Sequence, residues 1–240
     1  MSMLNKQLTI VIPCKNEGIN IYDCLGLIAK QKFIEGANII VADISDEEDS
    51  IHWLERAKID FAYKLKIYKI KGGYPAKARL EGSKLVTTPY ILFLDADIML
   101  KNNRVLIECY ENILAFEKDL ITLPFETEYG WNWAFRMFDF TQWLGNLFGT
   151  PFAIGGFQLW KTKAYWETGG YVETQKFAED YWVSAKCNPK KFMVLSIKGV
   201  WTSARRFKKK GIGYMIKVMI KSYFNRNNPA FFDDDQNYWK

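Results

Sequence analysis

Residues 89–97 read Pro-Tyr-Ile-Leu-Phe-Leu-Asp-Ala-Asp, and this stretch decides the fold class. The run at 90–94 is continuously apolar or aromatic, which is typical of a strand buried on both faces of a parallel sheet. Asp95 and Asp97 follow directly, at the carboxyl end of that strand. Open α/β sheets bind their ligands beyond the carboxyl ends of the strands. The stretch therefore predicts an α/β fold with a polar site that begins at Asp95.

The sequence on both sides of this stretch alternates strand and helix patterns. Strands are expected at 8–13, 38–43, 65–70, 89–94 and 120–123. Helices are expected between them, at 19–30, 49–58, 75–85 and 103–116. Such β-α alternation predicts a Rossmann-like, mostly parallel central sheet that helices cover on both faces. Asp43 also stands at the end of a predicted strand, so we expect it on the same edge as Asp95.

The second half of the chain has a different character. An aromatic helix is expected within 131–148, and a short strand at 157–160 follows the glycine pair Gly155-Gly156. Further on we expect a helix at 178–186, a strand at 192–197 and a basic helix at 208–224. The aromatic helix is explained by core packing, or else by an acceptor groove or an interfacial surface. Neither an internal repeat nor a low-complexity linker divides the chain, so one domain with a C-terminal appendage is expected.

Charge is distributed unevenly along the 240 residues, whose formal net charge is +6. Residues 181–232 contain no acidic residue but twelve lysines and arginines. This basic region is expected to meet an anionic partner, such as phosphates or a membrane surface. A hydrophobic fraction of 49% excludes a disordered chain.

The remaining composition bounds the compartment. The four cysteines form no CxxC pair and have no metal-ligand spacing, so buried reduced thiols in a reducing compartment are expected. No secretory signal and no apolar run of membrane-spanning length is apparent. The expected location is the cytoplasm, with peripheral contact at the inner face of the membrane. The lone histidine, His52, has no evident partner and is expected at the surface.

Asp95 and Asp97 form a candidate metal site. Two carboxylates one residue apart at a buried strand end repel each other unless a counter-ion is present. Carboxylate oxygens suit Mg²⁺ or Mn²⁺, which bridge protein carboxylates to diphosphate oxygens. The alternative for this short pattern alone is a solvated turn with two acids.

Several short motifs occur together in a fixed order. They are Pro13-x-x-Asn16-Glu17, Asp43 in Val41-Ala42-Asp43-Ile44-Ser45, Ala78-Arg79-x-x-Gly82, Phe93-Leu94-Asp95-Ala96-Asp97, Gly169-Gly170-Tyr171 and Glu179-Asp180. Each motif is weak by itself, but their order and spacing resemble a family 2 glycosyltransferase with the GT-A fold. The resemblance extends from about residue 8 to residue 207. It implies a nucleotide-diphosphate sugar as donor, a UDP-sugar by default, and a divalent metal, Mn²⁺ or Mg²⁺, as cofactor.

The resemblance implies roles for residues of the donor site. Asp43 would accept a hydrogen bond from the nucleobase, although its neighbour, usually a second aspartate, is Ala42 here. Asp95 would contact the ribose or a metal-bound water, and Asp97 would ligate the metal. The wider set implied to bind the nucleotide sugar is Pro13, Lys15, Glu17, Asp43, Arg79, Asp95, Ala96, Asp97, Arg205 and Arg206.

The resemblance also implies how the sugar is transferred. Asp180 would be the general base that takes the acceptor's proton, and Glu179 would be its companion. Transfer would proceed in a single displacement with inversion at the sugar carbon. Taken alone, the Glu179-Asp180 pair is better explained as acids that the helix dipole favours at a helix start, and it is the order of the motifs that favours the catalytic role.

Residues 203–207 lie where many relatives carry a Q-x-x-R-W segment. Both the glutamine and the tryptophan are absent here. That motif accompanies processive polymerisation in relatives, so its loss implies transfer of one sugar. Arg205 and Arg206 could still hold the donor diphosphate, or belong to a solvated basic loop.

The expected division of the chain is a GT-A catalytic domain at 1–207, with a nucleotide-binding half (1–100) and an acceptor half (101–207), and a basic amphipathic appendage at 208–240. Lys217 and Lys221 are four residues apart and share one helix face. Such a helix can lie in a membrane interface or pack on the domain with its lysines in solvent. The expected acceptor is a glycan or a lipid-linked hydroxyl, and no nucleic acid partner is expected.

Two other function classes compete with this interpretation. One is a non-catalytic module that binds an anionic surface, membrane or nucleic acid, through the basic C-terminal region. Such a module would not need Asp43, Asp95, Asp97 and Asp180 in this order. The other is a nucleotidyltransferase, which would normally start with a Gly-rich phosphate loop, whereas residues 13–17 read Pro-Cys-Lys-Asn-Glu.

Overall fold

A seven-stranded mixed sheet forms the centre of the computed structural model, which describes residues 4–127 and 130–234. Its strand order is β3-β2-β1-β4-β7-β6-β8. The strands are β1 (Leu8–Cys14), β2 (Ala37–Asp43), β3 (Leu65–Lys71), β4 (Tyr90–Leu94), β6 (Leu120–Thr122), β7 (Phe157–Lys161) and β8 (Phe192–Val194). The expected α/β class is confirmed.

The directions of the strands decide which segments meet at each end of the sheet. β1 pairs in parallel with β2 and β4, β2 with β3, and β6 with β8. Only β7 runs antiparallel to its neighbours, with Phe157 opposite Leu94. The residues just before β7 therefore arrive at the carboxyl end of β4, which is how Gly155 and Gly156 come beside Asp95.

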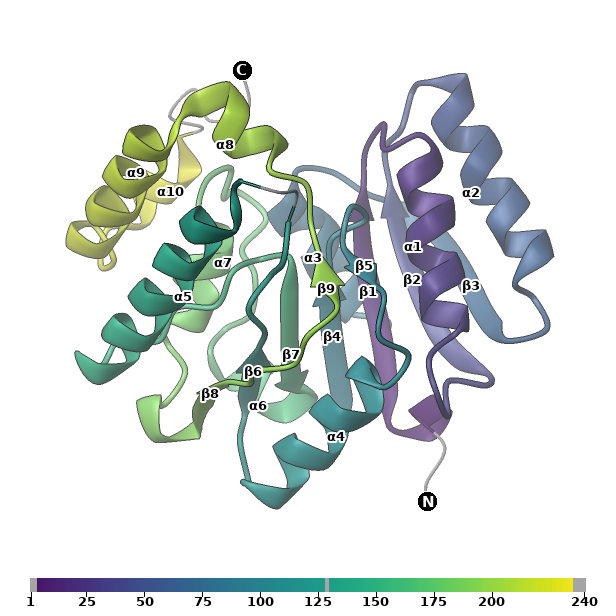
Figure 1. Ribbon diagram of the computed structural model, residues 1–240, viewed down its shortest axis with the longest axis horizontal. Coiled ribbons are helices and arrows are strands. Elements are labelled where there is room, and N and C mark those ends of the chain that lie inside the picture. The colour runs from purple at the N-terminus through teal and green to yellow at the C-terminus, as the bar shows by residue number, and fades with distance from the viewer. Residues whose placement is uncertain (1–3, 128–129, 235–240) are drawn as a thin grey trace.

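Helices cover both faces of the sheet, as the alternation predicted (Figure 1). One apolar cluster joins alternate strand residues such as Ile10 and Leu92 to α1 (Ile19–Ala29), α2 (Glu48–Asp60), α4 (Val105–Ala115) and α5 (Asn132–Leu147). The other cluster joins Val11 and Phe93 to α3 (Pro75–Ser83), α6 (Thr162–Glu167) and α7 (Glu179–Ser184). Successive side chains of a strand point to opposite faces, so neighbours in sequence serve different clusters.

The C-terminal part differs from its prediction. The single helix expected at 208–224 is wrong: two helices occur, α8 (Arg205–Lys210) and α9 (Ile212–Phe224), followed by α10 (Pro229–Asp233). Gly211 separates them with φ of 80°, a backbone conformation that suits glycine and ends a right-handed helix. The expected division after residue 207 falls inside α8, whose Phe207 packs on Phe135 and Phe138 of α5.

Three smaller features complete the fold. Two-residue strands β5 (Met99–Leu100) and β9 (Val200–Trp201) pair antiparallel in a second small sheet, and a 3₁₀ turn lies at each of Leu4–Lys6 (η1) and Pro189–Lys191 (η2). All four cysteines are buried free thiols. Across residues 4–127 and 130–234, no helix combines the length and apolar character needed to cross a bilayer.

Candidate active site

The candidate site lies at the carboxyl ends of β1, β2 and β4. Asp43 is the last residue of β2 and lies opposite Cys14, the last residue of β1. Asp95 directly follows β4, and its backbone N–H donates to the carbonyl of Gly156 at 3.2 Å. The strand ends thus bring together acids that are about 50 residues apart in sequence.

Arg79 is the centre of this site. It lies on α3 and is 2% exposed. Its Nη1 donates to Glu179 Oε1 at 2.6 Å, and its Nη2 donates to Asp95 Oδ1 at 2.5 Å. A guanidinium is planar and carries five N–H donors, so one Arg79 can hold two carboxylates from separate elements at fixed positions. The ring of Tyr171 lies beside it, 5.4 Å from Cζ.

Asp180 lies beside Arg79 in the first turn of α7. Its Oδ2 accepts from the backbone N–H of Gly155 at 2.8 Å, and its Oδ1 accepts from that of Tyr181 at 2.8 Å. Gly155 also offers its carbonyl to Arg79 Nη2 at 3.4 Å. A Cβ at this position would lie 3.0 Å from Arg79 Nη2 and 3.2 Å from Asp180 Oδ2, so glycine permits this close approach.

Burial and the adjacent Glu179 carboxylate raise the pKa of Asp180 to about 6, while Arg79 acts in the opposite direction. The two acids are neighbours at a helix start, and both cannot ionise in a dry site without cost. A carboxyl group with a pKa near neutrality is suited to accept a proton at physiological pH and to release it afterwards.

Asp43 is held by two other side chains. Its Oδ1 accepts from the backbone N–H and the hydroxyl of Ser45, at 2.9 and 2.6 Å, and its Oδ2 lies 3.1 Å from Lys69 Nζ. The Ser45 hydroxyl in turn accepts from the N–H of Asn16 at 2.9 Å. The loops after β1 and β2 are thereby joined at the edge of the site. Burial and the charge of Asp43 raise the pKa of Cys14 to about 12, so this thiol stays protonated.

Arg205 connects the C-terminal region to the same edge. Its Nη2 lies 3.8 Å from Glu17 Oε1 and 3.9 Å from Asp97 Oδ2. Its side chain is 65% exposed, so it can reorient toward a bound anion at small cost.

The other expected residues lie nearby in the chain. Pro13 is half-buried within β1, Lys15 is exposed directly after it, and Ala96 is buried between the two aspartates. The side chain of Arg206 lies outside the described part of the structure. The geometry thus joins Arg79, Asp95, Glu179 and Asp180 in one cluster and Glu17, Asp97 and Arg205 in another.

Four contributors to this site received no role from the sequence, although three of them lie within the quoted motifs or the glycine pair. They are Gly155, Ser45, Lys69 and Tyr171, which act through the contacts given above. The glycine pair at 155–156 was visible as a signal, because adjacent glycines before a strand indicate a close backbone approach. Lys69 had no signal, since its partner Asp43 is on a neighbouring strand that only the fold identifies.

The carboxylates of Asp95 and Asp97 are possible ligands for a divalent cation. Asp95 and Asp97 supply carboxylate oxygens, and the Asp95 side chain keeps 34% of its surface exposed beside its bond to Arg79. Among the described residues, no three or more His, Cys, Asp or Glu side chains are arranged so that they could hold a metal ion by themselves. Two carboxylates fit Mg²⁺ or Mn²⁺ only when substrate phosphates and water complete the coordination. The residues therefore fit a metal that arrives with a diphosphate.

Comparison with solved structures finds the same fold in several proteins. TarS from S. aureus superposes with a TM-score of 0.63 at 18% identity, over 90% of this chain and 39% of TarS. A TarS fragment, residues 1–349, solved in complex with UDP-GlcNAc, gives a TM-score of 0.60 at 17% identity, over 82% of this chain and 58% of the fragment.

The same fold occurs in a mannosyltransferase. The mannosyltransferase PcManGT from Pyrobaculum calidifontis, in complex with GDP-Man and Mn²⁺, gives a TM-score of 0.67 at 12% identity, over 95% of this chain and 69% of its own. At these identities the likeness establishes the fold. A search of curated protein sequences finds no match.

The family is established by sequence. The family model described as "Glycosyl transferase family 2" matches residues 9–169, about two thirds of the chain. This match includes the motifs from Pro13 to Gly169 on which the resemblance was based. The chain belongs to glycosyl transferase family 2.

Proposed function

We propose that the protein transfers one sugar from a nucleotide-diphosphate sugar to a hydroxyl of a glycan or lipid-linked acceptor, with inversion at the sugar carbon. The observation that carries this proposal is the setting of the Asp180 carboxylate. Its carboxylate is held by two backbone N–H groups, stands beside Arg79 and has a pKa raised to about 6. A base of this kind is what acceptor activation requires.

The donor would bind along the ends of β1, β2 and β4. Asp43 would accept a hydrogen bond from the nucleobase, and Pro13 and Lys15 would line its pocket. Asp95 would contact the ribose. UDP is the default nucleotide; relatives with the same fold were solved with UDP-GlcNAc and with GDP-Man.

Asp95 and Asp97 would hold a divalent metal together with the donor diphosphate. Such a cation neutralises the charge that develops on the leaving diphosphate. Arg205 would add a second cation there, because its guanidinium already lies within 4 Å of Asp97.

The transfer itself is a single displacement. Asp180 takes the proton of the acceptor hydroxyl while the acceptor oxygen forms a bond to the anomeric carbon. The bond between that carbon and the diphosphate oxygen breaks, and its electron pair leaves with the nucleoside diphosphate. Arg79 would be a positioning residue, since its two terminal nitrogens hold Asp95 and Glu179.

The proposal places the reaction in the cytoplasm and at the membrane inner face. All four cysteines are buried free thiols, which suits a reducing compartment. No nucleic acid partner is part of the proposal.

Calorimetric binding of UDP, GDP, CDP and dTDP, each with and without Mn²⁺, tests the donor site. We expect one nucleotide to bind in a metal-dependent manner, and Asp97→Asn to weaken it roughly tenfold or more. The matched control is Asp23→Asn, an exposed acid on α1 that should leave binding unchanged. Absence of binding by every nucleotide would contradict the proposal.

A further inference from the structure

Helix α5 exposes a row of large apolar side chains. Trp133, Met137, Phe140, Trp143 and Leu147 are all exposed, by 53%, 39%, 58%, 56% and 65% respectively. They recur every three or four residues, so they form one stripe along the helix. A helix on the surface of a water-soluble domain normally turns such a stripe toward the core.

The opposite side of α5 buries polar groups. Gln142 is fully buried, and neither of its amide atoms has a hydrogen-bond partner among the described residues. Asp139 and Asn146 each have one buried side-chain oxygen without a hydrogen-bond partner among the described residues. Burial raises the pKa of Asp139 to about 6. Unsatisfied buried polar atoms are costly. Because Phe135 and Phe138 also pack inward, α5 carries apolar side chains on both its inner and its outer side. A helix that is apolar all round is expected where its outer surroundings are also apolar.

Helix α9 lies next to α5 and continues the surface. Met215 of α9 shares one apolar cluster with Phe135 and Phe138 of α5, and Figure 1 shows the two helices side by side at one end of the molecule. The exposed apolar residues of α9 are Ile216, Ile220, Tyr223 and Phe224. We call the exposed apolar residues of α5 and α9 together the aromatic surface.

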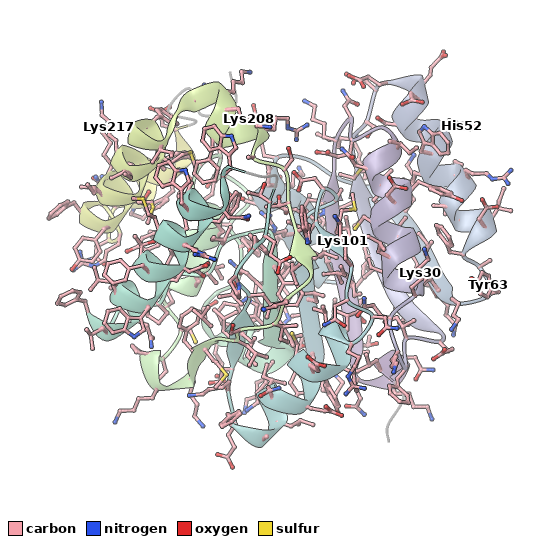
Figure 2. All side chains as sticks on the ribbon, viewed as in Figure 1. Lys30, His52, Tyr63, Lys101, Lys208 and Lys217 are labelled. Atoms are coloured by element: carbon pink, nitrogen blue, oxygen red, sulfur yellow. The ribbon has the colours of Figure 1, made fainter. Side chains whose placement is uncertain are left out.

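Basic side chains surround the aromatic surface. Lys217 and Lys221 are exposed on α9 beside its apolar residues, and Lys208 and Lys209 are exposed on α8 just before it. Figure 2 shows Lys217 on the outer side of this end of the molecule and Lys208 at the top of the view. No acidic residue occurs between 181 and 232, so nothing in α8 or α9 offsets this charge.

We propose that the aromatic surface and its lysines bind an anionic lipid bilayer. Tryptophan and tyrosine favour the membrane interface, and each lysine near an anionic leaflet adds about 1 kcal/mol of attraction. A second copy of the chain fits less well, because a two-fold contact would place the same lysines against one another. The amphipathic character and the charge both point to a lipid surface.

The surface is continuous along the chain with the candidate active site. Arg205, which lies near Glu17 and Asp97, is three residues from Lys208. A bound bilayer would present lipid-linked hydroxyls beside the site. If the protein is the glycosyltransferase proposed above, on which this step rests, its acceptor is therefore a hydroxyl carried by a lipid.

Vesicle co-sedimentation with the full chain tests the proposal. The vesicles contain phosphatidylcholine alone, or with about one third phosphatidylglycerol. The wild type should bind the anionic vesicles only. The pair Lys217→Gln and Lys221→Gln should weaken binding roughly 30-fold, and the pair Trp133→Ala and Trp143→Ala roughly tenfold or more.

Matched controls remove the same groups elsewhere. The pair Lys30→Gln and Lys163→Gln removes the same charge from the end of α1 and from α6. The pair Tyr63→Ala and Tyr68→Ala removes two exposed rings, one just before β3 and one within it. Figure 2 shows Lys30 and Tyr63 at the end of the molecule opposite Lys217. Both control pairs should bind vesicles as the wild type does.

The outcomes separate this inference from the proposed function. Equal vesicle binding by surface variants and controls would overturn it, as would a wild-type dimer in sedimentation velocity that Trp143→Ala disrupts without any vesicle binding. The surface variants should keep the nucleotide affinity of the wild type. A wild type that binds vesicles but no nucleotide would support this inference and contradict the donor site alone.

Discussion

The cluster around Arg79 and the outer face of α5 depart from the usual partition of side chains in opposite ways. Around Arg79, a guanidinium that is 2% exposed is surrounded by the carboxylates of Asp95, Glu179 and Asp180. On α5, Trp143 and Leu147 face solvent while Gln142 is buried. One region places charge inside, and the other places apolar surface outside.

The difference lies in how each departure is compensated. The charges at Arg79 are compensated in large part by ion pairs with Asp95 and Glu179 and by the backbone N–H groups of Gly155 and Tyr181, while Arg79 Nε has no hydrogen-bond partner among the described residues. Nothing within the described residues covers the stripe on α5. Local departures of this kind are retained at functional sites. In the first region most of the compensating groups belong to the chain, whereas the second fits the lipid surface proposed above.

The largest expected effect is on catalysis by Asp180. Asp180→Asn keeps the shape and one acceptor oxygen but cannot take a proton, so the transfer rate should fall roughly 10²- to 10⁴-fold. Nucleotide binding measured by calorimetry should be unchanged. A transfer rate within tenfold of the wild type would remove Asp180 from the role of base.

Removal of Arg79 should cost the most stability. Arg79→Met leaves Asp95 and Glu179 facing each other without a cation, and the free energy of unfolding should fall by about 3–5 kcal/mol. The matched control is Arg56→Met, whose ion pair with Asp60 is exposed on α2 and screened by solvent, so this change should leave the free energy of unfolding nearly unchanged. Urea denaturation followed by circular dichroism measures both.

A milder variant covers the case in which Arg79→Met does not fold. Arg79→Lys keeps the charge but cannot donate to two carboxylates in fixed directions. It should fold, bind nucleotide and show a lower kcat. Arg79→Lys with the kcat and the unfolding free energy of the wild type would show that the two-sided hold on Asp95 and Glu179 is not needed.

The pH dependence should follow the raised pKa of Asp180. A base works when ionised, so kcat/KM should be constant above about pH 6 and fall about tenfold per pH unit below it.

The contribution of Asp180 to folding stability should change with pH in the opposite direction. The folded state holds the Asp180 proton more tightly than the unfolded chain, so this contribution to stability declines as pH rises from 3.8 to about 6. Asp180→Asn should abolish both dependences; a wild-type rate profile that is flat from pH 5 to 8 contradicts this assignment.

The smallest expected effect concerns stability at the outer face of α5. Leu147→Ser should change the free energy of unfolding by about 1 kcal/mol or less, because the side chain is already 65% exposed. Phe135→Ala on the inner side of the same helix should cost about 3–5 kcal/mol. Thermal denaturation compares them. Equal costs would mean that the outer stripe is packed in the free protein.

The first half of the fold was predictable from local pattern. The strands at β1, β2, β3 and β4 and the helices between them lie within a few residues of their predicted ranges. Continuous apolar runs bounded by polar residues carry this information. The two-residue strands β5 and β9 are too short for any periodicity, and the reversed direction of β7 depends on its place in the sheet.

The candidate site was predictable only as a set of residues. The motif order identified Asp43, Arg79, Asp95, Asp97, Glu179 and Asp180, and the fold brings them to one edge. The pairing of Arg79 with both Asp95 and Glu179 requires α3 and α7 to meet the end of β4, which sequence spacing does not encode. For the helix at 131–148 the sequence left core packing and an interfacial surface or acceptor groove open, because periodicity does not show which of two apolar faces is turned outward. The structure places Phe135 and Phe138 in the core and leaves Trp143 and Leu147 exposed.

The stereochemistry of transfer tests the central claim most directly. Once calorimetry has identified the nucleotide, NMR of the product's anomeric centre reports whether the configuration has changed. A single displacement assisted by Asp180 predicts inversion, with no inverted product from Asp180→Asn on the same timescale. A product that retains the donor's configuration would contradict the account, since a single displacement from the face opposite the leaving diphosphate cannot give it.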